Sequence, residues 1–165
     1  MARSTTFKGS PLTLVGNELR SGDRLPPFRV TGVDLNDITE KTFSGSTLII
    51  SSVPSIDTPV CAAETRRFNQ EASSLASVKI LTVSLDLPFA QKRWCGAEGV
   101  ENVIMGSDYK HRSFGEAFGT CIQELGLLSR AVFVADGNGV LRYVQYVPEV
   151  AEEPDYEPVL AAAKK

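Results

Sequence analysis

Histidine is nearly absent from this sequence of 165 residues: His111 is the only one. A cysteine protease needs a histidine beside its nucleophile. The neighbours Lys110 and Arg112 instead indicate that His111 lies in a polar surface turn. The closely spaced cysteine and histidine pairs of zinc sites are missing, as are a phosphate-binding loop and a dinucleotide fingerprint. We therefore expect no metal and no other cofactor.

Long apolar runs and basic clusters are absent as well. No apolar stretch approaches the roughly 20 residues that span a bilayer, so we expect no membrane partner. The net charge is −3 with no basic run, which argues against nucleic-acid binding. Residues 1–4 lead into polar residues rather than the apolar core of a signal peptide. The three cysteines are too few and too widely spaced for a secreted disulfide framework, so we expect a cytoplasmic protein.

The most informative stretch runs from a strand into a helix. Residues 47–52 are strongly apolar and β-branched, which predicts a buried strand that Pro54 ends. Thr58 suits a helix N-cap and Pro59 the first helical position, so Cys61 falls in the first turn. A thiolate there would face unpaired backbone N–H groups, where cysteine pKa values can fall to roughly 3.5–7.5. The position therefore predicts a nucleophilic thiol.

A structural role for the same cysteine is equally compatible with its position. One helical stripe contains Cys61, Thr65, Phe68, Ala72 and Leu75, and free cysteine is among the most buried residue types. The local pattern therefore leaves both interpretations open, a reactive thiol and a small core residue.

The remaining pattern predicts an α/β fold for one domain, residues 1–165, with a central mixed sheet flanked by helices. We expect a hairpin over residues 5–15 and a helix from Pro59 to about Ser77. A short helix should contain Pro88 and break at Gly96. A last helix should open at Pro154. The other expected strands are residues 28–31, 78–84, 102–105, 130–134 and 140–147, and a short helix is expected at 112–117.

Several segments together resemble a known family. The spacing Pro54-x-x-x-Thr58-x-x-Cys61 resembles the active-site signature of the peroxiredoxins. Within that family, residues 86–91 (DLPFAQ) and 95–99 (CGAEG) resemble the second-cysteine segment of the bacterial thiol peroxidases, which are atypical 2-Cys peroxiredoxins. Residues 126–131 (GLLSRA) resemble the arginine-bearing strand, and 153–157 (EPDYE) the start of the C-terminal helix. The resemblance extends from Phe7 to Leu160.

The resemblance implies a thioredoxin-like fold with an N-terminal hairpin and a specific chemistry. It implies a thiol-dependent peroxidase that reduces hydrogen peroxide and organic hydroperoxides in antioxidant defence. Cys61 would become a sulfenic acid, Cys95 of the same chain would condense with it to a disulfide, and thioredoxin would reduce that disulfide. The resemblance also implies a homodimer. A redox-sensing module is the alternative, while the lack of a Cys-x-x-Cys motif argues against a disulfide oxidoreductase.

Each further candidate residue has a plain structural alternative. Arg130 could hold a thiolate and a peroxide oxygen, or could simply reach solvent from a strand end. Thr58 could bond the sulfur or only cap the helix, and Pro54 could shield the sulfur or only end the strand. Cys95 could be a small residue at a helix end, although the family segment favours a resolving role. Cys121 matches no family motif and is interpreted as a structural thiol.

Overall fold

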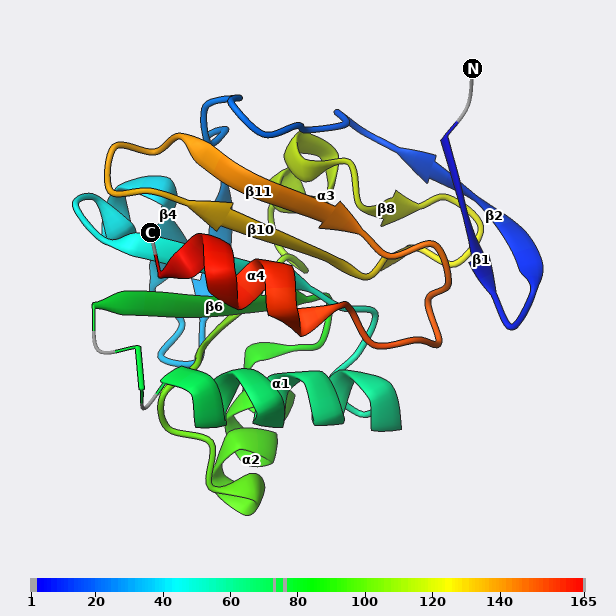
Figure 1. Ribbon diagram of the computed structural model, residues 1–165. Coiled ribbons are helices and arrows are strands. Elements are labelled where there is room, and N and C mark those ends of the chain that lie inside the picture. The colour runs from blue at the N-terminus through cyan, green and yellow to red at the C-terminus, as the bar shows by residue number, and fades with distance from the viewer. Residues whose placement is uncertain (1–2, 73, 76, 165) are drawn as a thin grey trace.

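A computed structural model describes residues 3–72, 74–75 and 77–164 (Figure 1). Its centre is a seven-stranded mixed sheet in the order β11-β10-β5-β6-β7-β3-β4. The β5–β6 and β6–β7 pairs are parallel, and the other pairs are antiparallel. The strands are β3 (Arg29–Gly32), β4 (Asp37–Thr39), β5 (Thr47–Ser52), β6 (Val78–Ser84), β7 (Ile104–Ser107), β10 (Ala131–Ala135) and β11 (Leu141–Tyr146).

A second sheet of four short strands contains the N-terminal hairpin. Its order is β1-β2-β8-β9, and the strands are β1 (Arg3–Phe7), β2 (Ser10–Val15), β8 (Cys121–Ile122) and β9 (Leu127–Leu128). The hairpin was expected from sequence, but β8 and β9 were not. They are two residues each and carry no pattern of their own, because they exist only through pairing with β2 and with each other.

Helices cover both faces of the large sheet. The helices are α1 (Pro59–Ala72), α2 (Pro88–Glu98), α3 (Ser113–Phe118), α4 (Tyr156–Ala163) and the 3-10 turn η1 (Glu40–Phe43). Residues of β5 and β10 alternate between the two faces, so Ile49 packs beneath α1 and α4 while Ile50 packs toward α3. Both faces are therefore buried, and this explains the continuous apolar character of these strands.

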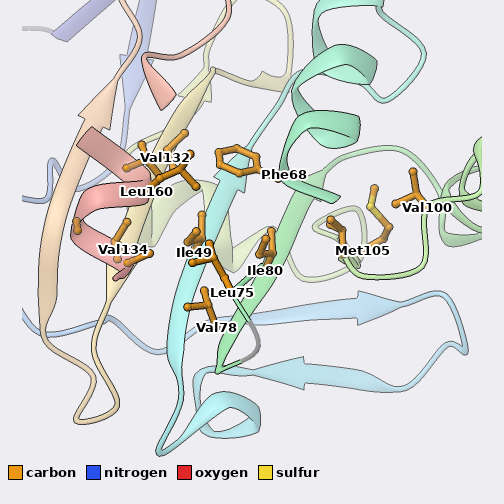
Figure 2. Packing of buried hydrophobic residues seen from close by; sticks show 14 of the residues in the cluster. Ile49, Phe68, Leu75, Val78, Ile80, Val100, Met105, Val132, Val134 and Leu160 are labelled. Carbon is orange, nitrogen blue, oxygen red and sulfur yellow. The ribbon is translucent and has the colours of Figure 1, made fainter. Parts of the chain in front are cut away.

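Figure 2 shows the core between the sheet and the two helices α1 and α4. Phe68 of α1 and Leu160 of α4 lie in one buried cluster with Ile49, Ile80 and Val132. Burial of each such side chain contributes on the order of 1.5–3 kcal/mol. This packing fixes α1, and with it Cys61, against the carboxyl end of β5.

Three expected helix boundaries are wrong. The first helix ends at Ala72 instead of reaching about Ser77. Gly96 lies inside α2, and the helix ends at Gly99, whose φ of 67° gives the left-handed cap that glycine adopts without strain. The last helix begins at Tyr156 rather than Pro154. No helix among the described residues is long and apolar enough to cross a membrane.

Candidate active site

Cys61 lies in the first turn of α1, directly after the loop that follows β5. The Thr58 Oγ1 atom accepts a hydrogen bond from the Cys61 N–H at 3.2 Å and donates one to the Ser55 carbonyl at 3.1 Å. Thr58 is therefore the N-cap that the sequence predicts, with Cys61 three residues beyond it. Cys61 itself has no exposed surface, because the apolar side of α1 faces the sheet.

The fixed cation of the site is Arg130, which directly precedes β10. Its Nη2 donates to Cys61 Sγ at 3.2 Å, its Nη1 to Glu64 Oε1 at 3.0 Å and its Nε to the Val150 carbonyl at 3.0 Å. The arginine is only 2% exposed, so the alternative of a strand-end arginine in solvent is wrong. Three fixed contacts leave the guanidinium one orientation, with one edge toward the sulfur.

Glu64 is a site residue that the sequence analysis missed. It is fully buried one turn after Cys61, and it accepts hydrogen bonds from Arg130 and from the Ser51 hydroxyl. The only sign of it in the sequence is its position directly before Thr65, which belongs to the helical stripe that begins at Cys61. A buried carboxylate is costly unless it is paired, and here its pairing orients the arginine.

Glu64 and Arg130 shift each other's pKa. Burial raises the pKa of Glu64, although Arg130 and the Ser51 hydroxyl act in the opposite direction. Burial alone would lower the pKa of Arg130, but the charges of Glu64 and Cys61 outweigh it and raise the pKa. The guanidinium therefore stays charged beside the sulfur, although it is almost completely buried.

A cavity of about 420 Å³ lies beside this cluster. Thr58 and Arg130 are polar residues of its wall, and Pro54, which is itself buried, also lines it. The rest of the wall is largely apolar. It comes from the hairpin, the first turn of α1, the β8–β9 segment and the loop before α4, through Phe7, Val60, Leu125, Leu127, Val150 and Ala151. The cavity can therefore hold a molecule with a polar end at Arg130 and an apolar remainder.

Cys95 is separate from this cluster. All three cysteines are free thiols. The start of α2 lies beside the Cys61 loop, because Ser55 and Ile56 both bond to Asp86. Cys95 comes seven residues after Pro88, the first residue of α2, which is roughly 10 Å farther along the helix axis.

The surroundings of Cys95 also differ from those of Cys61. Cys95 is half-buried and lines a different cavity, of about 510 Å³, with Val100, Val103 and Met105. Burial raises the pKa of its thiol. In this conformation Cys95 therefore lies in surroundings that it does not share with Cys61, and its raised pKa disfavours the thiolate.

The remaining candidates lie elsewhere. Cys121 is half-buried in β8 and lines a third cavity, of about 200 Å³, together with Asp108. His111 is exposed, and its Nε2 lies 3.8 Å from Asp37. Among the described residues, no group of three or more histidine, cysteine or acidic side chains is placed to hold a metal ion.

Comparisons with known proteins match nearly the whole chain. The sequence model of the Redoxin family matches residues 20–160. A thiol peroxidase of Halalkalibacterium halodurans is 53% identical over 161 residues, 98% of this chain and 97% of that protein. One of Bacillus subtilis is 52% identical over 159 residues, 96% of this chain and 95% of that protein. The crystal structure of a peroxiredoxin-like protein from Aquifex aeolicus superimposes with a TM-score of 0.92 at 43% identity, covering 99% of this chain and 97% of that one.

Proposed function

Since the chain belongs to the redoxin family and, within it, to the bacterial thiol peroxidases, we propose that Cys61 is the thiol that attacks the peroxide. The activity of the protein is thiol-dependent peroxide reduction, as the resemblance predicted. The Cys61 thiolate attacks the terminal oxygen, so that an S–O bond forms and the O–O bond breaks. The departing oxygen takes a proton and leaves as water or alcohol. Cys61 becomes a sulfenic acid, and the peroxide is reduced.

One observation carries the assignment: the Nη2 of Arg130 lies 3.2 Å from Cys61 Sγ. Because Glu64 and Val150 hold the other edges of the guanidinium, this donor is already oriented before any peroxide enters. A preorganised donor stabilises charge as it moves from sulfur to the leaving oxygen, without reorganisation during the reaction. Thr58 and Pro54 border the adjacent cavity, so they would orient the peroxide and exclude water.

Cys95 is the resolving thiol in this proposal. Its sulfur attacks the Cys61 sulfenic acid, an S–S bond forms, and the hydroxyl leaves as water. A dithiol of the thioredoxin type then reduces the disulfide by thiol exchange and is itself oxidised. Disulfide formation needs Cα atoms within roughly 7 Å. The separation along α2 therefore requires the segments that carry Cys61 and Cys95 to open locally before they react.

The apolar side of the cavity supports organic hydroperoxides as substrates beside hydrogen peroxide. Leu125, Leu127 and Val150 line the same cavity as Arg130, and burial of an alkyl group there would stabilise binding by about 25 cal/mol per Å² of apolar surface.

We also propose that the chain acts as one domain, residues 1–165, in a homodimer. Large apolar side chains remain exposed near the site, among them Phe89 at 68% and Leu125 at 43%, and burial against a second copy would remove them from water. Light scattering that finds only the 17.9 kDa monomer would exclude the dimer. Reduction by a thioredoxin requires a reducing compartment, which supports a cytoplasmic location.

Single-cysteine variants test the proposal. Cys61→Ser should abolish peroxide turnover with a thioredoxin system, because a serine hydroxyl has no accessible anion near neutral pH. In Cys95→Ser, one equivalent of peroxide should still oxidise the Cys61 thiol. Catalytic turnover should stop, because no resolving thiol is present. Cys121→Ser is the matched control, and its turnover should equal that of the wild type. Peptide mapping of oxidised protein should find a Cys61–Cys95 link; turnover close to wild type in Cys61→Ser would contradict the proposal.

A further inference from the structure

Asp86 joins the two cysteine-bearing segments, although it touches neither cysteine. It lies between β6 and α2, and its carboxylate accepts three hydrogen bonds. Two come from the Cys61 loop, from the Ser55 hydroxyl at 2.8 Å and the Ile56 N–H at 2.7 Å. The third comes from the Ser84 hydroxyl at 2.7 Å. One side chain therefore holds a loop that is 30 residues away in sequence.

The contacts continue from Asp86 into α2. The Ser84 hydroxyl oxygen accepts a hydrogen bond from Gln91 Nε2 at 3.0 Å, and the same nitrogen donates to the Gly106 carbonyl at 3.0 Å. Gln91 is fully buried and lies one helical turn before Cys95. The Asp86 carbonyl also accepts from the Ser107 hydroxyl at 2.5 Å. Gln91 of α2 is thus linked to the same carboxylate through Ser84.

The contacts continue equally from Asp86 to Cys61. Ser55 offers its carbonyl to the Thr58 hydroxyl at 3.1 Å and to the Thr58 N–H at 3.2 Å. Thr58 in turn caps the Cys61 N–H. An unbroken path of hydrogen bonds therefore runs from the Cys61 amide through Asp86 to the helix that carries Cys95.

We propose that Asp86 is a positioning residue that couples the opening of the Cys61 loop to the opening of α2, so that the two cysteines are released together for disulfide formation. This inference rests on the proposed function of Cys61 and Cys95. A loop that leaves Asp86 removes two of the three donors that hold its carboxylate in place. The carboxylate can then turn toward water and release the Ser84 hydroxyl, which no longer fixes Gln91. Bonds to a charged group are stronger than neutral ones and costly to leave unmade. The two openings therefore favour each other.

The coupling also sets the choice between two fates of the sulfenic acid. While the network is closed, Cys61 stays beside Arg130 and away from Cys95, where a second peroxide can oxidise it to sulfinic acid. Once the network opens, Cys95 can reach it. Asp86 therefore controls the fraction of Cys61 that is over-oxidised to sulfinic acid. This effect is separate from any effect of Asp86 on the stability of the fold.

The test is Asp86→Asn, which keeps the size of the side chain but removes its charge and one acceptor. After one equivalent of peroxide, the disulfide should form about tenfold faster, a factor that corresponds to about 1.4 kcal/mol. In excess peroxide, mass spectrometry should find less sulfinic acid than in wild type. Amide exchange of the reduced protein should rise in both residues 53–61 and 88–98. Ser55→Ala removes one of the three donors to the Asp86 carboxylate, together with the acceptor of the Asp57 N–H within the same loop. It should shift all three readouts in the same direction by less, and it tests the coupling if Asp86→Asn does not fold.

Asp136→Asn is the matched control, because Asp136 also accepts backbone N–H groups, in the β10–β11 turn. Its sulfinic acid fraction should equal that of the wild type even if it lowers stability. The coupling is overturned if Asp86→Asn forms the disulfide at the wild-type rate, or if exchange rises in only one of the two segments. If the wild type itself forms no Cys61–Cys95 link, the proposed function fails, and the coupling fails with it.

Discussion

Arg130 illustrates why a buried charge needs several partners. An arginine is seldom fully buried, because removal of its charge from water is costly. Here Glu64 supplies an opposite charge and accepts one N–H group, and Val150 and Cys61 accept one more each. The planar guanidinium fits three acceptors in fixed directions, so the same contacts that permit its burial aim it at the sulfur.

A lysine at this position should therefore be a poor substitute. Arg130→Lys keeps the charge, but an ammonium on a flexible stem cannot meet Glu64, Val150 and Cys61 together. We expect the peroxide step to slow on the order of 10²-fold, as for removal of one preorganised donor. Stopped-flow measurement of Cys61 oxidation would check this. Arg67→Lys on the outer side of α1, where the guanidinium stacks on Tyr156, is the control; an unchanged rate in Arg130→Lys would assign Arg130 a structural role only.

The site residues differ in how far the sequence could predict them. Cys61 and Thr58 follow from a local pattern, because a strand, a proline and a cap lie next to each other along the chain. Arg130 was identified only through its family motif. Glu64 and Asp86 were not identified as site residues, because their roles depend on partners 66 and 30 residues away. No local pattern reports such contacts.

At the scale of elements, two glycines near the end of α2 have different effects on where the helix ends. The sequence predicted that Gly96 breaks the helix, since glycine costs about 1 kcal/mol inside a helix. That cost is small enough for the surrounding helix to absorb, and the helix ends instead at Gly99, where the left-handed backbone needs glycine. By contrast, β5 and β6 have the expected bounds, because both are buried on two faces and read as continuous apolar runs.

Gly96→Ala should stiffen α2 and slow disulfide formation. A Cβ at position 96 meets no atom within 4 Å, and the backbone there is helical. Alanine should therefore stabilise the helix by about 1 kcal/mol and make its opening roughly fivefold rarer. More Cys61 should accumulate as sulfinic acid in excess peroxide, as measured by mass spectrometry.

Gly99→Ala provides the opposite control for this prediction. It places a side chain at a φ of 67°, which costs roughly 1–2 kcal/mol and loosens the last turn of α2. Its sulfinic acid fraction should fall below that of the wild type. If both variants match the wild type, opening of α2 does not limit disulfide formation.

At the scale of the whole molecule, the N-terminal hairpin supports the site from a distance. The Thr5 and Thr6 hydroxyls donate to the Pro148 carbonyl, and the Val150 N–H donates to the Thr6 carbonyl at 2.8 Å. Val150 in turn presents its own carbonyl to Arg130. The hairpin, expected from its turn residues alone, therefore holds the loop that orients the cation. The sequence could predict that the hairpin exists, but could not predict where it docks.

Glu149 makes this docking sensitive to acid. Its carboxylate accepts hydrogen bonds from the Ala151 N–H at 2.7 Å and the Gly9 N–H at 2.9 Å, and these lower its pKa from 4.5 to about 2. A group whose pKa is lower in the folded state contributes stability above its unfolded pKa, and that contribution is lost as pH falls through the folded value. Docking of the hairpin should therefore weaken between pH 4.5 and about 2.

Glu149→Gln tests this assignment. At neutral pH its free energy of unfolding, measured in urea by the fluorescence of the single tryptophan Trp94, should be lower than that of the wild type, because the charged acceptor is gone. The difference should shrink as the pH falls from 4.5 toward about 2, where the wild-type carboxyl also becomes neutral. Glu152→Gln, in the same loop and exposed, should follow the wild-type profile. A difference between Glu149→Gln and wild type that stays constant with pH would mean that the carboxylate charge does not hold the hairpin.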